Sequence, residues 1–297
     1  MIKLLSLSLV GTILYPQLKM KASFIDDRST FYCYEVFFVR VVLYNSSDST
    51  VLFPAELFLR GRIAPTGGPI QLSITKDGKS VVQTMWVDVL RYGPLPLPRD
   101  TVLLKPGDSL VTFITPLKGL HGHLVGYDVT EPGTYVLGRI KIQRDMERIP
   151  WVEDSIGLVF RIEEAPEGVQ KEFNGIIGSR KNPESAAEFI KRHPDHPLVT
   201  GAVAIASYYQ LYEYDPELLL SCAARFPQFF LLGEAYTELA RYVGAQMGWR
   251  VDPAFMTRLD SVLLANIFSR PYGEEILRWR EKNLGWKIGE RFKQGGE

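Results

Sequence analysis

The hydrophobic pattern of the chain changes between about residues 163 and 170, and this change limits the folds that the chain can adopt. Before that point, short segments rich in β-branched and aromatic residues alternate with turns of Gly, Pro, Asn and Asp, a pattern typical of an antiparallel sandwich. After it, Ala and Leu recur at helical spacing. We therefore predict an α+β fold of two domains, an antiparallel β-sandwich over 18–163 and an all-α domain of helical hairpins over 183–290. Residues 164–182 are expected to form either a linker or a packed segment, and 291–297 a tail.

The strand half is organised around TFYCYEVFFVRVVLYN, residues 30–45. This run is apolar on both faces, which predicts a central strand of a sandwich. Asp77-Gly78 predicts a hairpin, because both central positions of a type I′ turn need positive φ. The other expected strands are Val51–Phe53, Leu57–Arg62, Ile70–Thr75, Val81–Val89, Val102–Leu104, Ser109–Thr115, Gly133–Gln143 and Ile156–Ile162.

The helical half is marked by Xaa-Pro steps at 182–183, 196–197, 215–216, 226–227, 252–253 and 270–271. Proline is favoured at the first helical position, and three of these steps place a capping Asn or Asp before it. The expected helices cover 183–192, 197–213, 216–225, 228–246, 253–267 and 272–282. Paired as hairpins, their first members start at 183, 216 and 253, close to the ~34-residue period of tetratricopeptide repeats.

Several motifs resemble known families. VVLYNSSDSTVLF (41–53), LKPGDSLVTF (104–113) and DVTEPGTYVLGRI (128–140) are similar to strands and turns of bacterial immunoglobulin-like sandwich domains. AAEFIKRHPDHPLVTGAVAIASYYQLYEYDP (186–216) resembles the helix–turn–helix unit of tetratricopeptide-type proteins, without their full Trp-Leu-Gly-Tyr pattern. Both resemblances imply a fold and no particular activity.

The first 17 residues fit two interpretations. Lys3 followed by apolar residues up to Tyr15 and then Pro16 has the form of a signal peptide, with Ala22 a poor candidate for the cleavage position. LLSLSLV also alternates as a first β-strand would. The apolar run is shorter than the ~20 residues of a transmembrane helix. We expect export to the periplasm or the extracellular space, with a cytoplasmic location as the alternative.

Two clusters of histidine raise the question of a metal. HPDH in FIKRHPDHPLVTGA (189–202) brings His193, Asp195 and His196 together, and GLHGHLVG adds His121 and His123. Zinc needs three or four ligands, and these histidines lie in turns rather than on one helix face. We interpret HPDH as a turn in which His193 ends one helix and Asp195 or His196 caps the next. All four histidines therefore remain weak metal candidates, and no metal or cofactor is predicted.

Charge and motifs argue against several functions. Lys plus Arg and Asp plus Glu are equal at 34 each, which gives no basis for nucleic-acid binding. The sequence has neither a Gly-x-Ser-x-Gly nucleophile motif nor a phosphate-binding Gly-x-x-x-x-Gly-Lys. Cys33 and Cys222 are far apart and are expected to be buried free thiols. These observations favour a protein that is not an enzyme.

The segment RYGPLPLPRD, 91–100, is the most informative candidate for recognition. Its alternating prolines predict an extended segment that either enters a partner's groove or packs on the helical half. The predicted binding residues are Arg91, Tyr92, Leu95, Leu97, Arg99, Tyr212, Tyr214, Trp249 and Trp286. We expect a protein-binding or scaffolding protein with a cell-envelope partner. The alternatives are an exported hydrolase or its regulator, and a proteinase inhibitor that acts through 91–100.

Overall fold

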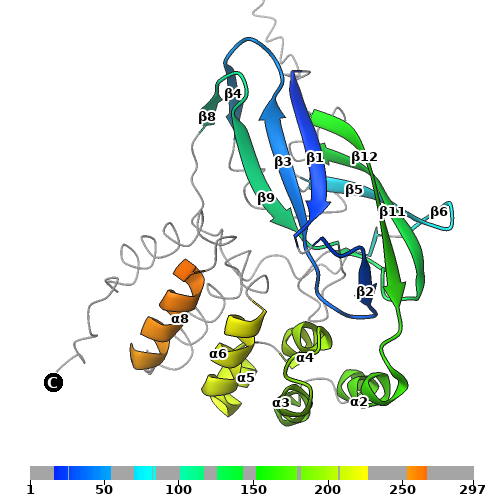
Figure 1. Cartoon of the computed structure of the whole chain (residues 1–297), viewed down its shortest axis with the longest axis vertical. Helices are drawn as coiled ribbons and strands as arrows, with labels where there is room; N and C mark the ends of the chain where they lie inside the picture. Colours follow the sequence, from blue (N-terminus) through cyan, green and yellow to red (C-terminus); the bar gives the residue numbers. More distant parts are fainter. Residues whose placement is uncertain are drawn as a thin grey trace, which may run out of the picture.

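A computed structural model describes seven stretches of the 297 residues: 17–54, 70–84, 101–116, 126–142, 152–178, 182–226 and 253–265, without Asp26, Val82 and Ser207. Within them the chain is a mixed α/β structure, with strands first and helices after (Figure 1). The predicted strand 57–62 and the predicted helices 228–246 and 272–282 lie outside the described residues. Residues 1–16 also lie outside, and with them nearly all of the segment interpreted as a signal peptide or a first strand.

Two sheets form the larger part of the strand half. The three-stranded sheet has the order β1-β3-β9, and the five-stranded sheet has the order β2-β12-β11-β5-β6. Two short ribbons, β4-β8 and β10-β7, complete it. The strands are β1 Leu18–Phe24, β2 Thr30–Tyr32, β3 Val39–Asn45, β4 Val51–Pro54, β5 Ile70–Lys76, β6 Lys79–Ser80, β7 Gln83–Thr84, β8 Thr101–Leu104, β9 Ser109–Ile114, β10 Gly126–Tyr127, β11 Gly133–Ile142 and β12 Val152–Glu163.

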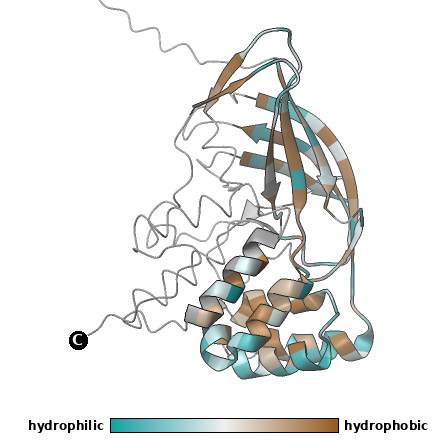
Figure 2. Cartoon of the chain, turned by 60° about the vertical axis from the view of Figure 1, so that its left-hand side comes forward, coloured by the Kyte–Doolittle hydropathy of each residue, from teal (hydrophilic) through white to brown (hydrophobic). Residues whose placement is uncertain are grey.

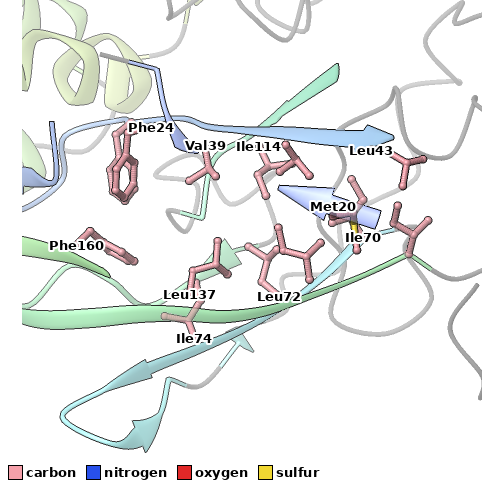
Figure 3. Close-up of a cluster of buried hydrophobic side chains, with 14 of the residues drawn as sticks. Met20, Phe24, Val39, Leu43, Ile70, Leu72, Ile74, Ile114, Leu137 and Phe160 are labelled. Atoms are coloured by element: carbon pink, nitrogen blue, oxygen red, sulfur yellow. The ribbon is translucent and has the colours of Figure 1, made fainter. Parts of the chain in front are cut away.

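The two main sheets face each other across a common hydrophobic core (Figure 3). Met20, Val39 and Leu43 from the three-stranded sheet meet Leu72 and Leu137 from the five-stranded sheet, and all of them are buried. Alternate residues of a strand point to opposite faces, so every second side chain of β1, β3 and β5 enters this core. The alternation expected from the sequence is thus the physical basis of the layered core.

Local turn signals predicted the hairpin correctly. Asp77 and Gly78 have φ of 50° and 77°, and they join β5 to β6 with Thr75 opposite Ser80. Tyr135, which follows the EPGT turn, donates its hydroxyl to the carbonyl of Glu131 at 2.8 Å. This hydrogen bond ties the turn before β11 to the strand itself.

The prediction of one continuous strand over 30–45 is wrong. The chain leaves the five-stranded sheet after β2, turns at Tyr34 with φ of 69°, and joins the three-stranded sheet as β3. The buried carboxylate of Glu35 holds this turn, because it accepts the Tyr32 N–H at 3.0 Å and pairs with the guanidinium of Arg28. The two main sheets are antiparallel as predicted, except that β2 pairs with β12 in parallel.

The helices lie at one end of the strands (Figure 1). They are α2 Glu167–Gly178, α3 Pro183–Arg192, α4 Leu198–Ala206, α5 Tyr208–Tyr214, α6 Pro216–Arg225 and α8 Pro253–Ala265. α3 and α6 have the bounds that the Xaa-Pro steps predicted. Asn182 caps α3 by accepting the Glu184 N–H at 3.0 Å, and Asp215 caps α6 through the Leu218 N–H at 3.0 Å.

Two helical predictions can be compared with the structure. The helix expected over 197–213 corresponds to α4 and α5, which lie on either side of Ser207, a residue outside the described ones. The segment 164–182, for which a linker and a packed segment were both considered, contains α2. Phe173 and Ile176 of α2 are buried in the same cluster as α3 and α4. The charged and polar residues of the helices lie mainly on their outer surface, where Figure 2 is teal.

Candidate functional site

Most of the predicted recognition residues cannot be placed. The residues Arg91, Tyr92, Leu95, Leu97, Arg99, Trp249 and Trp286, and the histidines His121 and His123, lie outside the described residues. Their roles stay predictions.

The two tyrosines of α5 differ in environment. The Tyr212 ring packs edge-on against Phe255 of α8 with centroids 4.7 Å apart, so this side chain belongs to the packing between helices. Tyr214 is 46% exposed. Lys191 lies over its ring at 6.0 Å and also binds Asp215 at 2.8 Å, which ties Tyr214 to the end of α3. Of this pair, only Tyr214 presents a surface that a partner could contact.

HPDH lies between α3 and α4, as the turn interpretation expects. The His193 N–H donates to the Phe189 carbonyl at 2.9 Å, and its Nε2 lies 3.1 Å from Glu172 Oε2 of α2. His196 Nδ1 accepts the Leu198 N–H at 3.2 Å and so caps α4. Each of these two histidines thus has a structural role at a helix end. Among the described residues, no group of three or more His, Cys, Asp or Glu side chains is placed to hold a metal ion.

The β4-β8 ribbon carries an exposed apolar surface that the sequence analysis missed. Leu52 of β4 and Leu103 of β8 are direct partners across the ribbon, and they are 55% and 63% exposed. Val51, Phe53 and Leu104 point the other way and are buried in the sandwich core. The signal was present in the sequence, because strand alternation places Leu52 and Leu103 opposite the buried residues. Figure 2 shows the ribbon in brown at the end away from the helices.

The sheets and the helices meet at residues 32–38, here called the joint segment. Phe38 lies in the helical core, and Tyr34 and Val36 pack against both hydrophobic clusters. The Tyr32 ring stacks on the His196 imidazole with ring centroids 5.0 Å apart. The Tyr34 ring packs against the Phe173 ring of α2 with ring centroids 5.9 Å apart. The joint segment therefore connects the two halves mainly through side chains that follow β2.

The first turn of α4 supplies the other side of this contact. Thr200 donates its hydroxyl to the Pro197 carbonyl at 2.7 Å, and its Oγ1 accepts the Val36 N–H at 3.0 Å. Gly201 follows, and a Cβ built there would lie 2.4 Å from the Tyr34 carbonyl oxygen. Only a residue without a side chain allows α4 to approach the joint segment so closely.

A polar hollow of about 340 Å³ lies on the outer face of the five-stranded sheet. Its polar lining comes from Gln71, Ser73, Ser80, Arg139 and Lys141. Glu153 already binds both cations, at 2.7 Å to Arg139 Nη1 and 3.6 Å to Lys141 Nζ. These are partly exposed ion pairs in a strongly screening environment, so they add little attraction for a ligand.

The two cysteines lie in environments that make their thiols unreactive. Both are buried free thiols. Burial raises the pKa of Cys33, and it raises the pKa of Cys222 to about 12. A thiol with a raised pKa stays protonated near neutral pH and is a poor nucleophile.

No family model matches the chain, and no curated protein matches it either. In the part of the chain that the structure describes, none of the helices has the length and apolar character needed to cross a membrane.

Proposed function

We propose that this chain is a non-enzymatic protein that binds another protein through the outer face of the β4-β8 ribbon. The observation that carries the proposal is the paired exposure of Leu52 and Leu103, at 55% and 63%. A single exposed leucine is ordinary on a protein surface. Two that face each other across a ribbon have Cβ atoms about 4.5–5.5 Å apart and form one continuous apolar surface.

The position of β8 in the chain supports this choice. β8 begins at Thr101, immediately after the proline-rich segment 91–100. That segment contains Leu95, Leu97 and two arginines, directly before β8 in the sequence. Aromatic and Arg side chains are enriched at protein–protein interfaces, so an apolar surface followed by such a segment suits a protein partner better than a small polar ligand.

The roles of the described histidines also favour a binding protein. His193 and His196 hold helix ends and contact neighbouring helices or strands. General acid–base catalysis recruits histidine more than any other residue, and here both side chains serve the packing of α3 and α4.

We also propose that the partner belongs to the cell envelope. The signal-like segment ends directly before β1, which starts at Leu18. Removal of residues 1–16 leaves β1 whole, whereas cleavage after Ala22 would remove the buried Leu18 and Met20. A mature chain that starts near Gln17 therefore combines export with an intact sandwich.

The test is a crosslinked capture from the native host with the full chain, tagged at its C-terminus, followed by mass spectrometry. Leu52→Ser combined with Leu103→Ser should lose the captured envelope protein. Val159→Ser is the matched control, because Val159 of β12 is 52% exposed on the outer face of the five-stranded sheet.

Three results would contradict the proposal. The first is the absence of any protein partner, and the second is capture that the double variant leaves unchanged. The third is equal loss of capture in the double variant and in Val159→Ser. A captured proteinase that the chain inhibits would favour the inhibitor alternative, and a captured hydrolase or hydrolytic activity of the chain itself would favour the hydrolase alternative.

A further inference from the structure

His196 occupies an unusual position at the contact between the helices and the joint segment. Its Nδ1 accepts the Leu198 N–H at 3.2 Å. The neutral ring therefore carries its proton on Nε2, and this buried atom has no hydrogen-bond partner among the described residues. The imidazole face stacks on Tyr32 of β2. One ring thus caps a helix on one side and contacts a strand on the other.

A second proton cannot enter this site without a structural change. It would bind Nδ1, where the new N–H would point at the Leu198 N–H that now donates to this atom. The cap would be lost, because a helix N-terminus needs an acceptor and is positively polarised. The cation would also be enclosed, with Nε2 buried and without an acceptor.

The charged groups around the turn do not offset this cost. His193 and Asp195 lie in the turn itself, and Glu172 of α2 already contacts His193 and Arg192. Asp195 is largely exposed and lies 3.6 Å from Arg225 of α6. On the strand side, Glu35 contacts Arg28 and the Tyr32 N–H. Burial lowers the pKa of His196 below its usual value, and the charge of His193 lowers it further.

The loss of the cap would reach the joint segment through three residues. His196 caps the first turn of α4, and Thr200 at the end of that turn accepts the Val36 N–H. Gly201 then lies against the Tyr34 carbonyl. Fraying of the first turn would release these contacts together, because they all depend on the same backbone.

We propose that the turn at His196 is an acid-sensitive joint, at which protonation of the imidazole in mildly acidic solution uncaps α4 and loosens the helices from residues 32–38. The direction follows from linkage. The unfolded or opened form binds the proton more readily than the closed form, so the closed form loses stability as the pH falls below about 6.5, the ordinary value for histidine.

Hydrogen exchange of the full chain at pH 7.5 and pH 5.0, corrected for the intrinsic exchange rate at each pH, tests the proposal. We expect faster exchange at pH 5.0 confined to residues 32–38 and the first turn of α4. His196→Asn should abolish the increase, because Asn still caps the helix and does not titrate. His193→Asn, in the same turn, should keep the increase, because it leaves the His196 cap in place.

Two outcomes would overturn the proposal. One is a wild type without extra exchange in these two segments at pH 5.0. The other is a His196→Asn variant that keeps the full increase. If His196→Asn does not fold, His196→Ser provides another capping residue, and the wild-type measurement decides by itself.

Discussion

Gly201→Ala is the most direct test of how closely the helices approach the joint segment. In the structure a Cβ at this position would lie 2.4 Å from the Tyr34 carbonyl oxygen and 2.9 Å from Cζ of Phe173. Ordinary carbon–oxygen contacts are about 3.3–3.6 Å. The added methyl group therefore needs a shift of about 1 Å in a backbone that the Val36–Thr200 hydrogen bond holds in place.

The expected effect combines two opposing terms. Alanine is favoured over glycine in a helix interior by about 1 kcal/mol. Overpacking of a tight core costs about 1–3 kcal/mol, and a clash with backbone belongs at the upper end of this range. We therefore expect a net loss of about 2 kcal/mol in the free energy of unfolding. For a chain of 297 residues that corresponds to a fall in Tm of roughly 3–4 °C.

Gly175→Ala is the matched control. Gly175 lies within α2, and a Cβ added there meets nothing within 4 Å. It should raise the stability by about 0.5–1 kcal/mol through helix propensity alone. Urea unfolding followed by far-UV circular dichroism measures both variants. A Gly201→Ala variant as stable as the wild type, or more stable, would refute the close approach of α4 to the joint segment.

Three further predictions concern the sandwich and the thiols. Removal of residues 17–22 should lower the free energy of unfolding by at least about 3 kcal/mol, since the buried Leu18 and Met20 and most of β1 are lost. Thermal unfolding of chains that start at 17 and at 23 measures the difference. Asn45→Ala should lower the free energy of unfolding, measured by urea titration, by about 2–3 kcal/mol, because the buried amide donates to the Ser49 carbonyl at 2.7 Å and to the Leu104 carbonyl of β8 at 2.9 Å. Asn174→Ala is the control, and it should change this free energy by less than about 0.5 kcal/mol because Asn174 is exposed. Cys33 and Cys222 should both react slowly with a disulfide reagent at pH 8 and rapidly in urea, since burial raises the pKa of each thiol; fast reaction of the folded chain would contradict their burial.

The candidate binding surface was only partly predictable. The sequence pointed to 91–100, and the structure adds the ribbon whose second strand follows that segment. Strand alternation alone indicated that Leu52 and Leu103 point away from the core. Their direct pairing depends on the register of β4 on β8, which joins residues about fifty positions apart. No local signal specifies such a register.

The sequence by itself determined the features that depend on a few neighbouring residues. The Asp77-Gly78 hairpin and the caps at Asn182 and Asp215 were predicted because turn and cap chemistry acts within one to four positions. The alternation of buried and less buried residues predicted for 30–45 is also present, although the continuous strand predicted there is not. Phe31, Cys33, Glu35 and Phe37 are all buried although the chain turns between them.

The tertiary structure decided where that long apolar run breaks and what it contacts. An extended segment that is apolar on both faces can remain in one sheet or pass from one layer to another at the same local cost. Here Arg28 and Tyr32 meet the buried Glu35, and α4 offers Thr200 and Gly201, so the chain turns at Tyr34 and enters the helical core. These partners lie up to 167 positions away, and only packing of the whole chain brings them together.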